Sequence, residues 1–133
     1  FLRRNRVMPV NIYKGEQILA ETIVGIDHNL FGNHNAWSKV AFFNQVDPDE
    51  KKDLINFLYT LIRSKNNNKD FKKLFNKIDI ERWVNFAAYQ IITQNYHNDH
   101  THNMRLVFDP WTGKVSPIVY DPWLGNTFFN DDL

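Results

Sequence analysis

The sequence predicts one α+β domain that is mostly helical and carries two β-hairpins. Apolar residues recur at helical spacing in three segments, at 48–65, 71–77 and 80–95. Strand-like runs flank turn residues at 14–16 and at 109–114. The chain has 133 residues, 43% hydrophobic and 15% aromatic, which is enough for one well-packed core and too little for two comfortable ones.

The first hairpin is expected over residues 7–26. Lys14-Gly15-Glu16 is the predicted turn, because Gly15 can adopt a positive φ. Apolar side chains define both strands, namely Val7, Val10, Ile12 and Tyr13 in the first and Ile18, Leu19, Ile23, Val24 and Ile26 in the return. Residues 27–45 follow as a long, irregular, ordered loop, anchored by Leu30, Phe31, Trp37, Val40, Phe42 and Phe43.

The segment 48–65 has strong helix signals. Asp47 is the expected cap, Pro48 suits the first position, and Glu50 lies three residues after the cap. A buried stripe is predicted at helical spacing, consisting of Leu54, Phe57, Leu58, Leu61 and Ile62. Asn66-Asn67-Asn68 reads as the loop that ends this helix.

Two further helices are predicted before the second hairpin. The first is short, 71–77, with Asp70 as its cap and Phe71, Leu74 and Phe75 facing inward. The second covers 80–95 and is capped by Asp79, with Ile78 and Trp83 placed to form a hydrophobic staple. Its predicted buried face comprises Ile80, Trp83, Val84, Ala87, Ala88, Ile91 and Ile92.

The second hairpin is predicted over residues 104–120. Met104 to Phe108 reads as a strand, and Asp109 to Lys114 has the Asp-Pro-x-x-Gly pattern of a turn. Val115 to Tyr120 is the partner strand, and Pro117 implies that it lies at a sheet edge.

Composition limits the partners. The formal net charge is +1, so no strong field steers the domain to nucleic acid or to a membrane surface, and Arg3-Arg4-Asn5-Arg6 reads as a solvated terminus. No apolar run approaches membrane-spanning length, and the absence of cysteine excludes disulfides and Cys-based zinc sites. The chain begins at Phe1, so we expect a piece of a longer protein, and the compartment stays open.

The run from Tyr96 to Asn103 carries the candidate chemistry. Asp99 and Asn103 precede the second hairpin, and Asp121 follows it directly. A magnesium–nucleotide phosphotransferase needs a carboxylate that orients the attacking hydroxyl and accepts its proton. It also needs an amide and a second carboxylate that hold the metal. Asp99 fits the first role, and Asn103 and Asp121 fit the other two. Taken alone, each residue is more simply explained as capping a turn or satisfying backbone groups, and only the three together, in order around one hairpin, favour the site.

A rival interpretation is a zinc site. His97, His100 and His102, together with Asp99, offer nitrogen and oxygen ligands within six residues, while His28 and His34 are remote in sequence. In the phosphotransferase interpretation, His97 instead packs and fixes the loop by hydrogen bonding, and His100 and His102 lie near the cleft mouth. His97 and His102 are then the supporting residues of the site. A third possibility is a non-catalytic binding groove lined by Trp111, Tyr120, Trp123, Phe128 and Phe129.

These residues resemble the spore-coat CotH kinase family over about 7–128. The resemblance rests on the helix that starts at Asp79-Ile80-Glu81 and on Asp99 with His102-Asn103. It continues through Leu106-Val107-Phe108-Asp109-Pro110, Gly113-Lys114 and Pro117 to Tyr120-Asp121. The stretch Pro9-Val10-Asn11-Ile12-Tyr13-Lys14-Gly15-Glu16 resembles the N-terminal lobe hairpin of that family, and Asp27 to Phe31 follows it as expected.

The resemblance implies an atypical protein-kinase-like fold and transfer of phosphate from ATP to protein Ser or Thr. It marks Asp99 as the catalytic-loop residue, Asp121 as the metal residue and Asn103 as a second ligand. Residues 1–46 would form an N-lobe-like hairpin and loop, and residues 47–133 a helical lobe with the catalytic-loop hairpin, in one domain that lacks upstream N-lobe parts. Members of this family are often secreted or surface-associated.

The sequence departs from the common protein-kinase loop at one place and from the family pattern at two. Asn103 lies four positions after Asp99, where the common protein-kinase loop has five. Trp123 replaces the second Asp of the family motif, and Gln17-Ile18-Leu19-Ala20 replaces an aromatic-Gly-x-Tyr run. No residue is assigned as the nucleotide-contacting lysine, for which Lys39 is the candidate. A catalytically inactive relative, or a surface protein-binding module on the same scaffold, is therefore the alternative.

Overall fold

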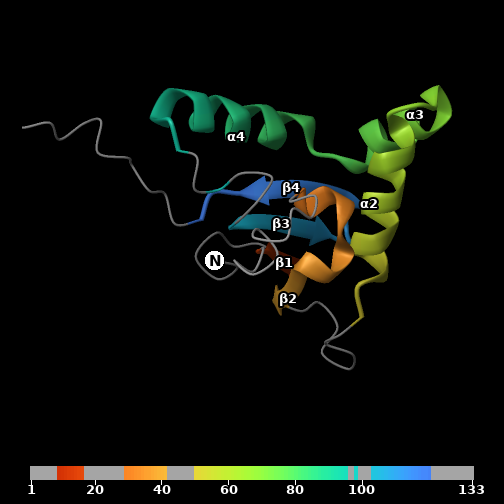
Figure 1. The fold of residues 1–133 in the computed structure, drawn as a ribbon, viewed down its shortest axis with the longest axis horizontal. Helices are drawn as coiled ribbons and strands as arrows, with labels where there is room; N and C mark the ends of the chain where they lie inside the picture. Colours follow the sequence, from red (N-terminus) through yellow and green to blue (C-terminus); the bar gives the residue numbers. More distant parts are fainter. Residues whose placement is uncertain (1–8, 17–28, 42–49, 96–97, 99–102, 121–133) are drawn as a thin grey trace, which may run out of the picture.

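The computed structural model describes residues 9–16, 29–41, 50–95, 98 and 103–120. In this part of the chain, a four-stranded antiparallel sheet packs against three α-helices (Figure 1). The strands are β1 (Asn11–Gly15), β2 (Trp37–Ala41), β3 (Met104–Asp109) and β4 (Lys114–Ile118), in the order β2-β1-β3-β4. The helices are α2 (Lys52–Ser64), α3 (Asn68–Lys77) and α4 (Ile80–Thr93), and two 3-10 turns, η1 (Leu30–Gly32) and η2 (His34–Ala36), precede β2.

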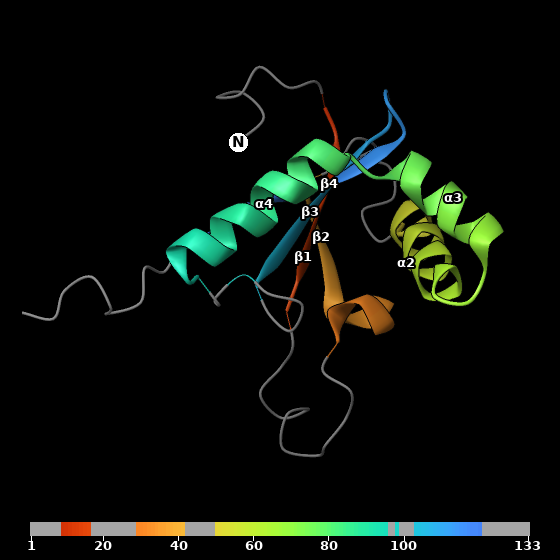
Figure 2. The same cartoon turned by 90° about the horizontal axis from the view of Figure 1, so that it is seen from above.

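The helices lie on one side of the sheet. Figure 2 shows α4 passing over the strands, while α2 and α3 lie side by side next to the sheet. None of the helices in the described ranges is long and apolar enough to cross a membrane. The α+β class and the helical content agree with the prediction.

The turn predicted at residues 14–16 for the first hairpin is wrong. Lys14 and Gly15 lie inside β1, where Gly15 pairs with Trp37 of β2 on one side and with Met104 of β3 on the other. Both edges of β1 are thus occupied, and a return strand cannot pair with residues 11–15. Gly15 is required for packing rather than for a turn, because a Cβ there would lie 2.9 Å from Leu30 Cδ1 and 3.0 Å from Trp37 ring atoms. The predicted return strand lies outside the described residues.

The segment predicted as an irregular loop contains a strand. Residues 37–41 form β2 and pair with β1 in antiparallel register. Leu30 and Trp37 are anchors, as expected, since both are fully buried and the Trp37 indole N–H donates to the Leu30 carbonyl at 2.8 Å. The many Asn, His and Gly residues nearby masked the strand signal. These residues form the two 3-10 turns. The Asn29 side chain caps the first turn, and the Asn33 side chain caps the second.

Helix α2 begins four residues later than predicted. Glu50 is not helical, and Lys51 stands at the cap position without a side-chain capping hydrogen bond, since its ammonium donates to the Trp37 carbonyl instead. Asp47 and Pro48 lie outside the described residues. The predicted core stripe is confirmed at Leu54, Phe57 and Leu58, which are buried. Leu61 packs partly against the core, and Ile62 is exposed.

Helix α3 begins at Asn68, and its cap is Asn67 rather than Asp70. The Asn67 side chain accepts from the backbone N–H groups of Lys69 and Asp70. Asp70 is instead buried inside the first turn, where it pairs with Arg63 of α2 at 3.1 Å and with Lys73 at 3.1 Å. Leu74 faces the core as predicted, but Phe71 and Phe75 are each 53% exposed, with their ring centroids 6.5 Å apart.

Helix α4 has the predicted cap but a different buried face. The Asp79 side chain accepts from the Arg82 backbone N–H, which confirms the helix start. Phe86 is the residue that is buried against the sheet, and Trp83 packs partly against the same core. The remaining residues of the predicted face are exposed, namely Ile80, Val84, Ala87, Ala88, Ile91 and Ile92. Because α4 is apolar on most sides, spacing alone could not select the face that packs.

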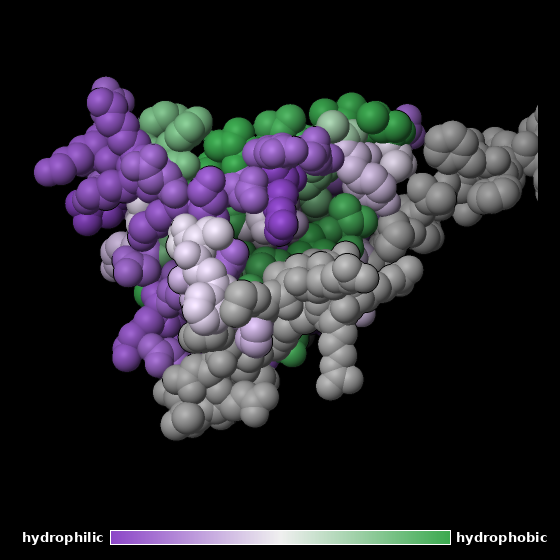
Figure 3. Space-filling model, turned by 180° about the vertical axis from the view of Figure 1, so that it is seen from behind, coloured by the Kyte–Doolittle hydropathy of each residue, from purple (hydrophilic) through white to green (hydrophobic). Residues whose placement is uncertain are grey.

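Figure 3 shows this uneven distribution on one side of the molecule. Apolar residues line α4, whereas hydrophilic residues gather over α2 and α3. Ile91 and Ile92 are 77% and 75% exposed, respectively.

The second hairpin is confirmed. β3 and β4 pair in register from Arg105↔Ile118 to Asp109↔Lys114, and Gly113 closes the turn with φ of +68°. The Asp109 carboxylate accepts from the Trp111 and Thr112 backbone N–H groups, as the Asp-Pro pattern predicts. β4 is an edge strand of the described sheet, as Pro117 implied. Its Val115 carbonyl accepts from the Asp79 N–H and from the Trp83 indole N–H, each at 3.0 Å.

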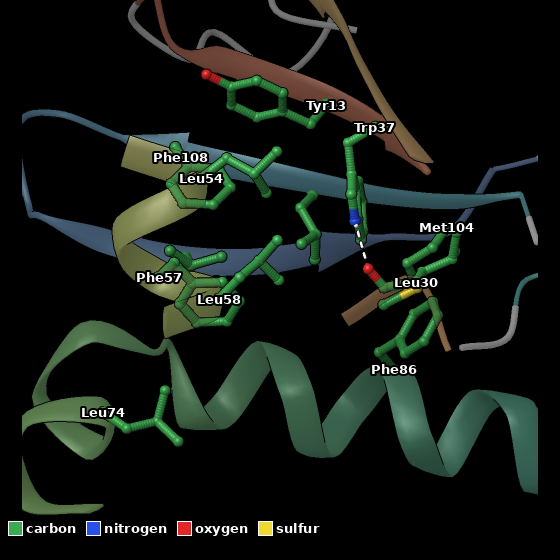
Figure 4. Packing of buried hydrophobic residues seen from close by; sticks show 12 residues of the cluster. Tyr13, Leu30, Trp37, Leu54, Phe57, Leu58, Leu74, Phe86, Met104 and Phe108 are labelled. Carbon is green, nitrogen blue, oxygen red and sulfur yellow. Dashed lines mark hydrogen bonds between the residues drawn. The ribbon is translucent and has the colours of Figure 1, made fainter. Parts of the chain in front are cut away.

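The core lies between the sheet and the helices (Figure 4). Tyr13 and Phe108 meet edge to face with ring centroids 5.2 Å apart, and Phe57 meets Phe108 in the same way at 5.7 Å. The opposite face of the sheet carries a second, smaller apolar cluster of Val10, Ile12 and Val107.

Candidate functional site

Asn103 is the one predicted site residue that the structure describes. It directly precedes β3 and has φ of +53°, a left-handed conformation that Asn tolerates better than most residues. Its side chain is half-buried. Its amide oxygen is the hard donor that magnesium prefers. Asn103 therefore fits the ligand role on chemistry and on accessibility.

The β3–β4 hairpin sets the relation between Asn103 and Asp121. Arg105 pairs with Ile118, so the chain enters β3 at the same end of the hairpin at which it leaves β4. Asn103 lies two residues before Arg105, and Asp121 three residues after Ile118 in sequence. Asp121 lies outside the described residues, as do Asp99, His97, His100 and His102.

Buried amides connect the end of α4 to this region. Helix α4 ends at a left-handed Gln94, with φ of +50°, and the Asn95 N–H donates to the Gln90 carbonyl at 3.2 Å. Asn95 and Asn98 are each 1% exposed, and the Gln90 side-chain amide donates to the Asn98 carbonyl. The predicted helix 80–95 ends at Asn95, directly before the candidate run, but Gln90 and Asn98 were not predicted as supports of this segment. Nothing in their spacing distinguished them from surface amides.

Arg105 is a buried cation next to the candidate ligand. It follows Asn103 by two residues on β3 and is 9% exposed, and its guanidinium lies 4.0 Å from the Tyr120 ring centroid. Its Nη1 has no hydrogen-bond partner among the described residues. Sequence reasoning missed this residue, because an Arg in a strand normally reads as a surface position.

Lys39 is not brought to Asn103. It lies on β2, where its ammonium donates to the Glu50 carbonyl at 3.1 Å and lies 5.9 Å from the Tyr13 ring centroid. Tyr13 separates it from β3, since Tyr13 pairs with Lys39 on one side and with Leu106 on the other. Nucleotide contact by Lys39 therefore has no support from the described geometry.

The structure describes only some residues of the alternative zinc site and of the alternative aromatic groove. Across the residues that the structure describes, no group of three His, Cys, Asp or Glu side chains could hold a metal ion. The histidines of the zinc interpretation lie outside that set, apart from the exposed His34. Of the proposed aromatic groove, Trp111 and Tyr120 are exposed, but they stand at opposite ends of the β3–β4 hairpin, so they do not line one groove together.

Among the residues that the structure describes, the pKa values of Tyr13 and Asp70 are shifted. Burial, reinforced by the Asp53 carboxylate, raises the pKa of the Tyr13 phenol far above its ordinary value. The Lys73 hydrogen bond, together with Arg63, holds the pKa of Asp70 below its ordinary value. Neither residue lies at the Asn103 end of the hairpin, so both shifts concern stability rather than the candidate chemistry.

Comparison with known proteins gives one match. The family described as CotH kinase protein matches residues 7–131, which is nearly the whole chain. Neither a curated protein nor a solved structure matches the chain. The match includes the candidate loop, the hairpin and Asp121.

Proposed function

Because the chain belongs to the CotH kinase family, we propose that it transfers phosphate from Mg-ATP to Ser or Thr hydroxyls of a protein. The family assignment supports kinase-like function in general. The acceptor class, the nucleotide and the metal are the finer parts of this proposal. A secreted or cell-surface or spore-surface location is proposed on the same ground.

The observation that carries the proposal is the β3–β4 register. In this register the start of β3, which follows Asn103, lies beside the end of β4, after which the chain continues to Asp121. An amide and a carboxylate that flank one hairpin in this way are suited to hold one magnesium ion. Held by Asn103 and Asp121, magnesium would supply positive charge that offsets the negative charge of the transferred phosphate.

Each residue of the candidate site would then have a distinct role in phosphate transfer. Asp99 would orient the acceptor hydroxyl and accept its proton. Asn103 and Asp121 would hold the metal, and the buried amides Asn95 and Asn98 would fix the loop that carries Asp99. His97 and His102 are proposed as supporting residues of the same loop.

Calorimetric titration of ATP into the 133-residue chain, with and without magnesium, tests the proposal. We expect binding that requires magnesium and that Asp121→Ala abolishes. Glu81→Ala is the matched control, because Glu81 is an exposed carboxylate on α4, and this variant should bind as the parent does. Equal binding by the parent and by Asp121→Ala would overturn the metal assignment.

The second candidate is a catalytically inactive kinase-like or protein-binding module. Trp123, at the position of the second family Asp, favours it because an indole cannot ligate magnesium. Absence of any ATP binding, by this chain and by a longer parent chain, would select it. Stoichiometric zinc that is lost on His100→Ala would instead replace both candidates with the His-rich metal protein.

A further inference from the structure

A cavity of about 430 Å³ lies between α2, the end of α3 and the turn that joins β3 to β4. Its apolar wall includes the buried Phe57, Phe108 and Val115. Four lysines and three carboxylates line the rest, in residues Lys39, Lys52, Lys77, Lys114, Glu50, Asp53 and Asp109. An apolar wall with a few converging polar groups, at this volume, is typical of small-molecule sites.

The cavity is separate from the Asn103 region. Its lining includes Phe108 and Asp109 at the end of β3, whereas Asn103 precedes the start of that strand. Five residues of extended strand separate Asn103 from Phe108, which corresponds to about 17 Å. A small ligand bound here would therefore not reach Asn103.

The three carboxylates already have donors. The Asp53 carboxylate accepts from the Tyr13 hydroxyl at 2.5 Å, from the Asn11 amide at 2.8 Å and from the Leu54 N–H at 2.8 Å. Glu50 pairs with Lys52 at 3.1 Å.

The third carboxylate, Asp109, is satisfied by its own turn. It accepts from two backbone N–H groups and from the Thr112 hydroxyl at 3.0 Å. A cationic ligand would therefore have to compete with existing hydrogen bonds at Asp53 and Asp109 and with the Lys52 ion pair at Glu50.

Lys77 and Lys114 differ from the other two lysines of the cavity in their partners. Lys39 donates to a carbonyl and Lys52 pairs with Glu50, but neither Lys77 nor Lys114 has a carboxylate partner within the described ranges. The Lys77 ammonium donates one long hydrogen bond to the Thr60 hydroxyl, at 3.5 Å. Lys77 ends α3 and Lys114 begins β4, so two separate elements bring two cations to one cavity.

We propose that this cavity binds a small aromatic phosphomonoester. The phosphate, which carries nearly two negative charges at neutral pH, would be bound by the ammonium groups of Lys77 and Lys114. The aromatic ring would lie against Phe57 and Phe108, which are themselves arranged edge to face. This proposal does not depend on the proposed kinase function.

Titration of phenyl phosphate into the ¹⁵N-labelled 133-residue chain, followed by NMR in EDTA, tests this site. We expect saturable shifts of the amides around Lys77 and from Asp109 to Val115. The double variant Lys77→Gln/Lys114→Gln should weaken binding at least tenfold. The control Lys69→Gln/Lys72→Gln, which removes the same charge from exposed positions of α3 outside the cavity, should bind as the parent does.

Each other outcome overturns the proposal. Equal weakening by both double variants would show general charge attraction. If benzoate bound as tightly as phenyl phosphate, the site would not be specific for phosphate. If inorganic phosphate bound as tightly, the aromatic ring would contribute nothing to binding. Shifts that are absent from the cavity amides, or that Asn103→Ala reduces, would place the ligand elsewhere. The single variants Lys77→Gln and Lys114→Gln, with unchanged circular dichroism, guard against a folding defect.

Discussion

The Tyr13 hydroxyl donates to the Asp53 carboxylate at 2.5 Å, across the contact between β1 and the first turn of α2. Tyr13 is fully buried, and Asp53 also accepts from Asn11 of the same strand. One carboxylate thus ties the N-terminal strand to the helix that follows β2. This contact joins residues 40 apart in sequence.

Tyr13→Phe should lower the free energy of unfolding by about 1–3 kcal/mol, because it removes one donor from a partly buried carboxylate. Urea denaturation measures the change. Tyr59→Phe is the control, since Tyr59 is 65% exposed, and it should change stability little. Equal effects of the two substitutions would mean that the Tyr13–Asp53 bond contributes nothing.

The same pair predicts an alkaline limit to stability. The pKa of Tyr13 is raised in the folded chain above its ordinary value of 10.0, so folding favours the protonated phenol. Its contribution is complete below pH 10 and is lost as the pH rises further. Thermal melts from pH 8 to pH 11 should show a steeper loss for the parent than for Tyr13→Phe; parallel curves would contradict the shift.

Gly15→Ala should destabilise the fold by about 1–3 kcal/mol through overpacking. The added Cβ would meet Leu30 at 2.9 Å and the Trp37 ring at 3.0 Å, both of which are fully buried. Gly32→Ala is the matched control, because nothing lies within 4 Å of a Cβ there. Chemical denaturation of both variants measures the difference, and a neutral Gly15→Ala would contradict the close approach of Leu30 and Trp37 to this residue.

The exposed face of α4 gives a further stability prediction. Ile91→Lys and Ile92→Lys should each change the unfolding free energy by no more than about 0.5 kcal/mol, as surface substitutions do. Phe86→Ala should cost about 3–5 kcal/mol, since it leaves a cavity in the core. A large loss of stability in the lysine variants would show that the face predicted from the sequence is buried after all.

Asp99→Ala should retain magnesium-dependent ATP binding but slow phosphate transfer by about 100- to 10,000-fold, the usual contribution of a positioned general base. Transfer of labelled γ-phosphate to a Ser/Thr peptide library provides the assay, with Glu81→Ala as the active control. Transfer at the parent rate would remove Asp99 from the mechanism.

Prediction from sequence succeeded where a short segment determines its own structure. The Asp109–Lys114 turn and the Asp79 cap depend on side chains that bond to backbone groups two or three residues away. Both were therefore predicted correctly, as was the position of Pro117 in an edge strand.

Prediction failed where distant segments decide the structure. Gly15 reads as a turn residue until β2 and β3 are known to pair on both sides of it. Phe71 and Ile91 have the spacing of core residues, but which side of a helix packs depends on elements elsewhere in the chain. Of the candidate site, Asn103 and the hairpin geometry came from local patterns, whereas the buried Arg105 and Asn98 had no signal in the sequence.

The Val115 carbonyl, which accepts from both Asp79 and Trp83, also limits how this sheet can grow. An edge strand with free backbone groups is a template for pairing with other chains and hence for aggregation. On β4 that acceptor is already used twice, and Pro117 offers no N–H. As far as the described residues extend, a strand from another molecule could therefore add to this sheet beside β2 more readily than beside β4.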